Sequence, residues 1–244
     1  MNKKNICIPL GFLLAFAAHA QKKPLDHTVY DSWQTISSPD ISKSGKFVLV
    51  QVSPQEGDNQ LFLKTNENKE LVQISRGYNG KLTDSEIHLV SLIKAPFAVT
   101  RDAKIKKKKA EDLPKDSLAI YNLTTSSIVK FAQVKSYKIA DQNNNFVSFL
   151  FDKELNEKTE QKKTIDEGST KKSNDKKRKT IATLALYDLN SGDSVQFSAV
   201  DQYEWNKNGS KIVFSKKTDS KDSLSKESGV YLYEIATKKL KKIS

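Results

Sequence analysis

The stretch Trp205-Asn-Lys-Asn-Gly-Ser-Lys-Ile-Val-Phe214 and the thirty residues after it decide the fold class. Its first half is a polar turn rich in Asn and Gly, which accept positive φ at low cost, and its second half begins an alternating strand. A second strand is predicted at residues 229–235, a turn at 236–239, and a third strand from residue 240. Strands joined by short turns, with no helix between them, are typical of one blade of a β-propeller.

The same turn-and-strand pattern recurs near Gly45, in residues 79–85 and at residues 143–145. The spacings of roughly forty to sixty-five residues compare with about 40–50 residues for one blade. We therefore predict an all-β chain, a partial β-propeller of about four blades. Residues 78–80 are predicted as a turn, and residues 100–112 are the best candidate for a short helix. Further strands are predicted at residues 47–52, 60–64, 70–74, 86–94, 117–123, 127–131, 146–151, 183–189 and 194–197.

Aromatic side chains fall at strand positions of this pattern. Such residues favour strands and pack well between neighbouring sheets, so we expect them to form the core between blades rather than a ligand-binding box. They are Phe47, Phe62, Tyr121, Phe149, Tyr187, Phe214, Tyr231 and Tyr233, and the same expectation covers Trp205.

The N-terminal residues 1–20 have the features of a secretory signal peptide. Lys3 and Lys4 precede an apolar run over residues 6–18, and Ala18-His-Ala20 fits the cleavage rule. Cleavage after Ala20 predicts a periplasmic or secreted protein whose mature region is residues 21–244; the alternative is a buried helix or membrane anchor. The single cysteine, Cys7, lies within the leader, so the mature chain has no disulfide or thiolate metal site.

The net charge of +12 comes from 41 basic and 29 acidic residues, and the charges are concentrated in two places. One is the run Lys106–Lys109. The other is residues 152–180, where lysines alternate with acidic residues and little can be buried, which predicts a solvated, disordered insertion. Mixed charge and export argue against a nucleic-acid partner, and the mature form is expected to have no membrane segment. A basic surface that binds polyanions remains an alternative.

Residues that could perform chemistry are few. The chain has no Gly-x-Ser-x-Gly nucleophile motif. His27 and His88 are expected to be structural, since two isolated histidines about sixty residues apart are a poor start for a zinc site. Residues 77–80 lack the strand-to-helix setting of a phosphate loop. The sequence predicts no catalytic, cofactor-binding or metal-binding residues and no cofactor.

Three segments resemble secreted serine peptidases of the prolyl oligopeptidase family from Bacteroidetes-type bacteria. They are Lys23-Pro-Leu-Asp-His-Thr-Val-Tyr-Asp-Ser-Trp33, Val52-Ser-Pro-Gln-Glu-Gly-Asp58, and Thr100-Arg-Asp-Ala-Lys-Ile-Lys-Lys-Lys-Lys109 with Leu113-Pro-Lys-Asp-Ser-Leu118 after it. The resemblance implies a propeller that restricts peptide access to an α/β-hydrolase domain carrying Ser, Asp and His. Only the propeller part has counterparts here, so we expect a chain truncated before the catalytic domain, inactive alone, with peptides as partners.

An unclosed set of blades would expose two apolar faces. At roughly 25 cal/mol per Å², a few hundred Å² per face costs several kcal/mol, comparable to the net stability of a domain. The isolated chain is therefore expected to be marginally stable, or to associate with itself. The alternative function is a stand-alone periplasmic propeller-like module that binds a protein or peptide without catalysis.

Overall fold

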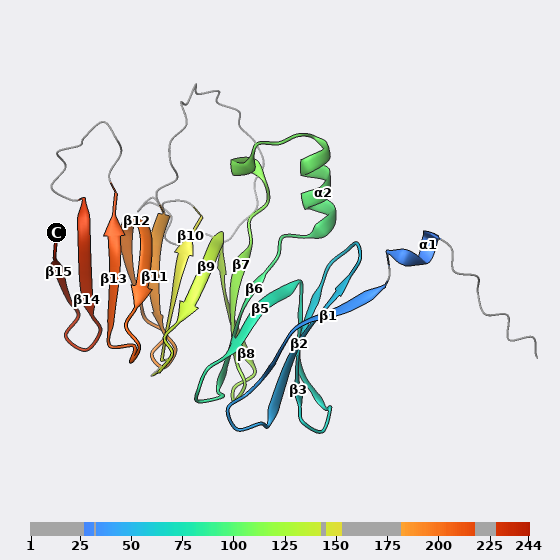
Figure 1. The fold of residues 1–244 in the computed structure, drawn as a ribbon, viewed down its shortest axis with the longest axis horizontal. Coiled ribbons are helices and arrows are strands. Elements are labelled where there is room, and N and C mark those ends of the chain that lie inside the picture. Colours follow the sequence, from blue (N-terminus) through green and yellow to red (C-terminus); the bar gives the residue numbers. More distant parts are fainter. Residues whose placement is uncertain (1–26, 32, 143–144, 153–181, 218–227) are drawn as a thin grey trace, which may run out of the picture.

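The computed structural model describes residues 27–31, 33–142, 145–152, 182–217 and 228–244. These residues form antiparallel sheets with short helices at their margins, as Figure 1 shows. The predicted signal peptide and nearly all of the predicted charged insertion, residues 153–180, lie outside the described residues.

The first two blades are separate four-stranded sheets whose strands pair in sequence order. The first contains β1 (Gln34–Ile41), β2 (Phe47–Pro54), β3 (Gln60–Thr65) and β4 (Glu70–Ser75); the helix α1 (His27–Tyr30) precedes it. The second contains β5 (Gly77–Leu82), β6 (His88–Ile93), β7 (Ser117–Asn122) and β8 (Ser127–Ala132). Between β6 and β7 lie the helix α2 (Phe97–Ile105) and the short 3₁₀ helix at Ala110–Asp112.

The remaining strands form one seven-stranded sheet that contains two blades. They are β9 (Val134–Ile139), β10 (Phe146–Phe151), β11 (Ala182–Asp188), β12 (Ser194–Trp205), β13 (Lys211–Lys216), β14 (Gly229–Glu234) and β15 (Lys239–Lys242). The long strand β12 belongs to both blades, because its first half pairs with β11 and its second half with β13. Among the described residues no strand of the first blade pairs with the fourth, and the two lie at opposite ends of the array (Figure 1).

One residue with positive φ joins each blade to the next. Arg76 and Gln133, with φ of 62° and 59°, stand directly before β5 and β9, and Ala199, with φ of 61°, lies within β12 where this strand passes from blade three to blade four. The carbonyl of each accepts a backbone hydrogen bond from the residue that follows the second strand of the new blade: Lys94 (2.9 Å), Asp152 (2.7 Å) and Lys217 (3.0 Å). The repeated junction fixes the blade register and confirms the predicted partial propeller of about four blades.

The turn between the first and second strands is also repeated. Ser42, Thr83 and Asn206 each donate a backbone N–H to the carbonyl five residues on, and each side-chain oxygen accepts the N–H of that same residue. The fourth residue of each turn, counted from Ser42, Thr83 or Asn206, has positive φ; these residues are Gly45, Glu86 and Gly209. This local bonding explains why short polar residues recur at the first position of the turn.

Three apolar clusters hold successive blades together. The second strands β6 and β10 are buried on both faces, so alternate side chains pack against different neighbours: Leu89 and Ile93 face the first blade, and Val90 and Leu92 face the third. Of the predicted inter-blade aromatics, Phe149, Phe214 and Tyr233 are buried in these clusters, while Phe47, Tyr121, Tyr187 and Tyr231 pack at their margins.

Buried tyrosines at equivalent positions connect the later blades. Tyr137 donates its hydroxyl proton to Val90 O (3.2 Å), and Tyr203 donates to Ser148 O (3.3 Å), the third residue of the second strand in the preceding blade in both cases. The equivalent residue of the second blade is Gly80, where an added Cβ would lie 2.7 Å from Leu61 Cδ2 and 2.9 Å from Leu49 Cδ2. The leucines of the first blade thus fill the space that tyrosine rings occupy elsewhere.

Several sequence predictions need correction. Residues 78–80, predicted as a turn, lie within β5, because the Asn and Gly residues form a bulge in a strand rather than a hairpin. The strand predicted at residues 86–94 begins at His88, and the predicted short helix ends at Ile105. The sequence pattern does not predict the strands β1 and β9.

Candidate functional site

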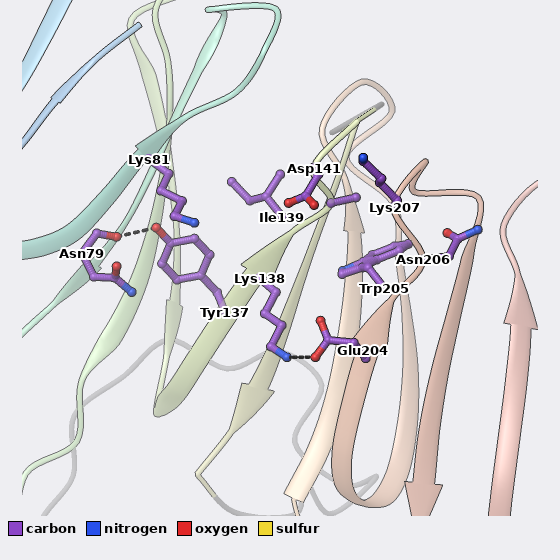
Figure 2. Close-up of a pocket in the computed structure, with 11 residues that line it drawn as sticks. Asn79, Lys81, Tyr137, Lys138, Ile139, Asp141, Glu204, Trp205, Asn206 and Lys207 are labelled. Carbon is purple, nitrogen blue, oxygen red and sulfur yellow. Dashed lines mark hydrogen bonds and ion pairs between the residues drawn. The ribbon is translucent and has the colours of Figure 1, made fainter. Parts of the chain in front are cut away.

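A pocket of about 320 Å³ lies on the first strands of blades two, three and four, as Figure 2 shows. This volume is at the lower end of the usual range for ligand pockets. Its walls are mostly polar and come from segments far apart in the sequence. The lining residues are Asn79, Lys81, Tyr137, Lys138, Ile139, Ala140, Asp141, Glu204, Trp205, Asn206 and Lys207.

An ion pair between neighbouring blades forms part of the pocket wall. The Lys138 ammonium pairs with the Glu204 carboxylate and donates a hydrogen bond to Tyr203 O (3.1 Å). It also lies 5.2 Å from the centre of the Tyr203 ring, within cation–π distance. Lys138 is therefore held by three contacts, and its charge is balanced by that of Glu204.

Two aromatic side chains are fixed in the wall by hydrogen bonds. The Tyr137 hydroxyl donates to Asn79 O in the bulge of β5 and to Val90 O. The Trp205 indole N–H donates to Ser148 Oγ (2.6 Å). Burial raises the pKa of Tyr137, and the nearby Tyr78 raises it further; burial also raises the pKa of Tyr203. These hydroxyls therefore stay protonated and act as hydrogen-bond donors at neutral pH.

The charges in the pocket are unevenly balanced. Three lysines, at 81, 138 and 207, face the two carboxylates of Asp141 and Glu204. In Figure 2, Asp141 lies toward Lys207, whereas Lys81 lies on the side of Asn79 and Tyr137. Within the described residues the Lys81 amino group has no ion-pair partner.

A larger hollow of about 680 Å³ lies beside the segment between α2 and β7. Its lining includes Lys108, Glu111, Asp112 and Lys115, and Lys115 forms an ion pair with Asp152 (2.7 Å). The helix α2 itself is fastened to the loop after β2, because Asp58 accepts the Phe97 N–H (2.8 Å) and Glu56 pairs with Arg101 (3.1 Å). The second and third segments of the sequence resemblance therefore contact each other.

Of the residues considered from sequence for chemistry, Asn79 and Trp205 line the smaller pocket and Lys108 lines the larger hollow, whereas the two histidines line neither. His88 is buried in β6, and its Nε2 lies 3.1 Å from Asn122 Nδ2; burial lowers its pKa. His27 lies in α1, and its side chain is not among those that the structure describes. In the basic run, Lys106 pairs with Asp102 (2.8 Å) and Lys109 lies 3.9 Å from Glu111.

The described residues contain neither a candidate metal site nor a candidate membrane-spanning helix. In the described ranges no three His, Cys, Asp or Glu side chains group as a metal site would require. No helix among these residues has the length and apolar character needed to cross a membrane.

Trp205 belongs both to the core and to the pocket wall. It packs against the core cluster of the third and fourth blades, as expected from sequence, and one side of it also lines the pocket. Sequence reasoning missed the pocket itself, because most of its lining residues lie on β5, β9 and the second half of β12. The repeat that relates the lining residues Lys81, Lys138 and Glu204, each five residues after a junction, becomes visible only when the junction φ values are known.

Comparison with solved structures identifies propellers of peptidases that share this fold. The β-propeller domain of the Trilobed protease from Pyrococcus furiosus, described as having an open velcro topology, aligns with a TM-score of 0.50 and 12% identity over 87% of this chain and 58% of that one. An uncomplexed Pyrococcus horikoshii acylaminoacyl peptidase aligns with a TM-score of 0.50 and 13% identity over 90% of this chain. An acylaminoacyl peptidase in complex with Z-Gly-Gly-Phe-chloromethyl ketone aligns with a TM-score of 0.50 and 14% identity.

The chain spans 58% of the length of the protease domain and 34% of each of these peptidases. A scan against protein-family models finds no match, and a search of curated proteins finds no significant one. At 12–14% identity the structural likeness establishes the propeller fold.

Proposed function

We propose that this chain is the propeller part of a secreted serine peptidase of the prolyl oligopeptidase type, a protein that also has an α/β-hydrolase catalytic domain. In this role it admits short peptides to an α/β-hydrolase domain and keeps folded proteins out. The observation that carries the proposal is the likeness to a protease propeller over 87% of the chain. The three sequence segments that resemble this peptidase family support it independently of the fold.

The pocket supplies a reason for a propeller to interact with peptides. Its walls combine fixed hydrogen-bond donors, charged groups of both signs and the Trp205 ring, which suits the amides and side chains of a short peptide. The nucleophile and its base belong to the catalytic domain in this proposal, in keeping with the lack of a Gly-x-Ser-x-Gly motif in these 244 residues. The protein is proposed to work in the periplasm or outside the cell, after cleavage behind Ala20.

An antibody against the second blade tests the proposal in extracts of the source organism. The precipitated material is treated with a fluorophosphonate probe, which labels activated serine nucleophiles. The proposal predicts a labelled polypeptide in the precipitate, and heating before treatment should abolish the label. A precipitate that contains the chain but no labelled polypeptide would favour a propeller that binds peptides or proteins without catalysis.

A further inference from the structure

We propose that the pocket on β5, β9 and β12 binds the carboxylate of a peptide, and that Lys81 is the residue that selects it. The proposal rests on the peptide-handling function above and names the chemical class of ligand that this site prefers. The carboxylate belongs either to an acidic side chain or to a free C-terminus, because the same cation recognises both.

The internal repeat shows why Lys81 differs from its counterparts. Lys81, Lys138 and Glu204 stand five residues after the junction residues Arg76, Gln133 and Ala199, so they are equivalent positions in three successive blades. The charges of Lys138 and Glu204 neutralise each other across the third and fourth blades. The charge of Lys81 has no such partner in the described part of the chain, so it is available to a ligand.

The surroundings of Lys81 favour an anionic acceptor group. In Figure 2 its amino group points into the pocket beside the Tyr137 ring, with the Asn79 side-chain amide on the same side. The Tyr137 hydroxyl is held by Asn79 O, so the ring keeps its place without a ligand. An ammonium group and an amide N–H₂ are donors that a carboxylate accepts.

The opposite end of the pocket has different chemistry. Asp141, Asn206 and Lys207 supply acceptors as well as donors there, and the Trp205 ring lies beside Asn206 and Lys207 at the same end (Figure 2). A peptide can therefore place a carboxylate at Lys81, and an apolar side chain and main-chain amides at the end that contains Trp205. This polarity gives the ligand one preferred direction.

Fluorescence of Trp205 provides a direct assay, because the chain has only two tryptophans and Trp33→Phe leaves Trp205 as the sole reporter. Three acetylated tetrapeptides are titrated into the full chain carrying that substitution. One is Ala-Ala-Gln-Ala with an amidated end, the second has Glu in place of Gln, and the third has Gln and a free C-terminus. Binding of either carboxylate peptide about three- to fivefold more tightly than the neutral one is expected, as for a solvent-accessible ion pair.

Two charge-matched variants distinguish a preference for carboxylate that arises at Lys81 from one that arises from the overall positive charge of the chain. Lys81→Gln is expected to remove the preference for carboxylate, and 0.5 M salt should weaken it. Lys135→Gln removes one positive charge from an exposed position of β9 outside the pocket and should leave the preference intact. Circular dichroism of each variant checks that the fold is retained.

Preference for one carboxylate peptide identifies the source of the ligand and supports the proposal. Equal affinity for all three peptides, no change of Trp205 fluorescence with any of them, or a preference that survives Lys81→Gln would overturn it. These results leave the peptidase function unaffected, because labelling of the precipitated protein by the fluorophosphonate probe tests that function separately.

Discussion

Removal of the Tyr137 hydroxyl tests how much its hydrogen bonds stabilise the contact between the second and third blades. Replacement by Phe keeps the buried ring in place and removes only the hydrogen bonds to Asn79 O and Val90 O. Asn79 lies in the bulge of β5, between the paired residues Tyr78 and Lys81, where the register of the ladder shifts. A buried acceptor left without a donor costs about 1–3 kcal/mol.

Water from the pocket can reach Asn79, so the lower half of that range applies, about 1–2 kcal/mol. For a domain of this size we expect the melting temperature to fall by about 2–8 °C. Tyr203→Phe is the matched comparison, since it removes a single bond of 3.3 Å, and about 0.5–1 kcal/mol is expected. Urea unfolding followed by tryptophan fluorescence measures both.

Tyr121→Phe serves as the control, because the Tyr121 ring packs beside the core and its hydroxyl bonds to nothing within the described ranges. The reasoning predicts the order Tyr137→Phe, then Tyr203→Phe, then the control, from largest to smallest loss. A Tyr137→Phe variant as stable as the control would refute the assigned role of this hydroxyl in joining the blades.

Three further predictions follow from the core and the blade junctions. Gly80→Ala should destabilise the chain by about 1–3 kcal/mol in urea unfolding, because the new Cβ meets Leu61 and Leu49; an unchanged midpoint would contradict this close packing. Phe149→Ala should cost about 3–5 kcal/mol, measured the same way, since the ring is fully buried; a loss below 1 kcal/mol would count against it. The free energy of unfolding should fall as the pH rises above about 10, because tyrosines ionise in the unfolded chain while burial keeps the pKa of Tyr137 higher in the folded one. Tyr137→Phe should make this fall less steep when unfolding is measured as a function of pH. An equally steep fall in the variant would exclude Tyr137 as its cause.

The sequence predicts the second, third and fourth strands of the blades well, for a physical reason. Strands such as β6 and β10 are buried on both faces and appear as unbroken apolar runs, while the hairpin turns around Gly45 and Gly209 need residues that adopt positive φ. Both signals are local and can be recognised without knowledge of the tertiary structure.

The first strands escape prediction because they follow neither pattern. In β1, the sequence Gln-Thr-Ile-Ser-Ser-Pro-Asp-Ile is mostly exposed and contains a proline. A single residue, Gln133, separates β8 from β9, and glutamine is not a residue that marks a turn in a sequence. In β5, glycine and asparagine indicate a turn, although Gly80 is needed for close packing against the first blade.

The candidate site is unpredicted for the same reason. Three of its charged residues, Lys81, Lys138 and Glu204, lie on the first strands, where exposure removes the apolar alternation that marks a strand in sequence. The pairing of Lys138 with Glu204, sixty-six residues away, depends on the placing of two blades side by side. Only the repeat of the junction connects these positions in the sequence, and it appears once the φ values are known.

The mass of the native protein tests the central claim most directly. Extracts of the periplasm and the culture medium are separated by denaturing electrophoresis and probed with the antibody against the second blade. The account predicts a band well above 27.5 kDa, the mass of these 244 residues, as a propeller joined to a hydrolase domain requires. A single band at the size of residues 21–244, with no larger species, would contradict the peptidase proposal and favour a propeller that binds without catalysis.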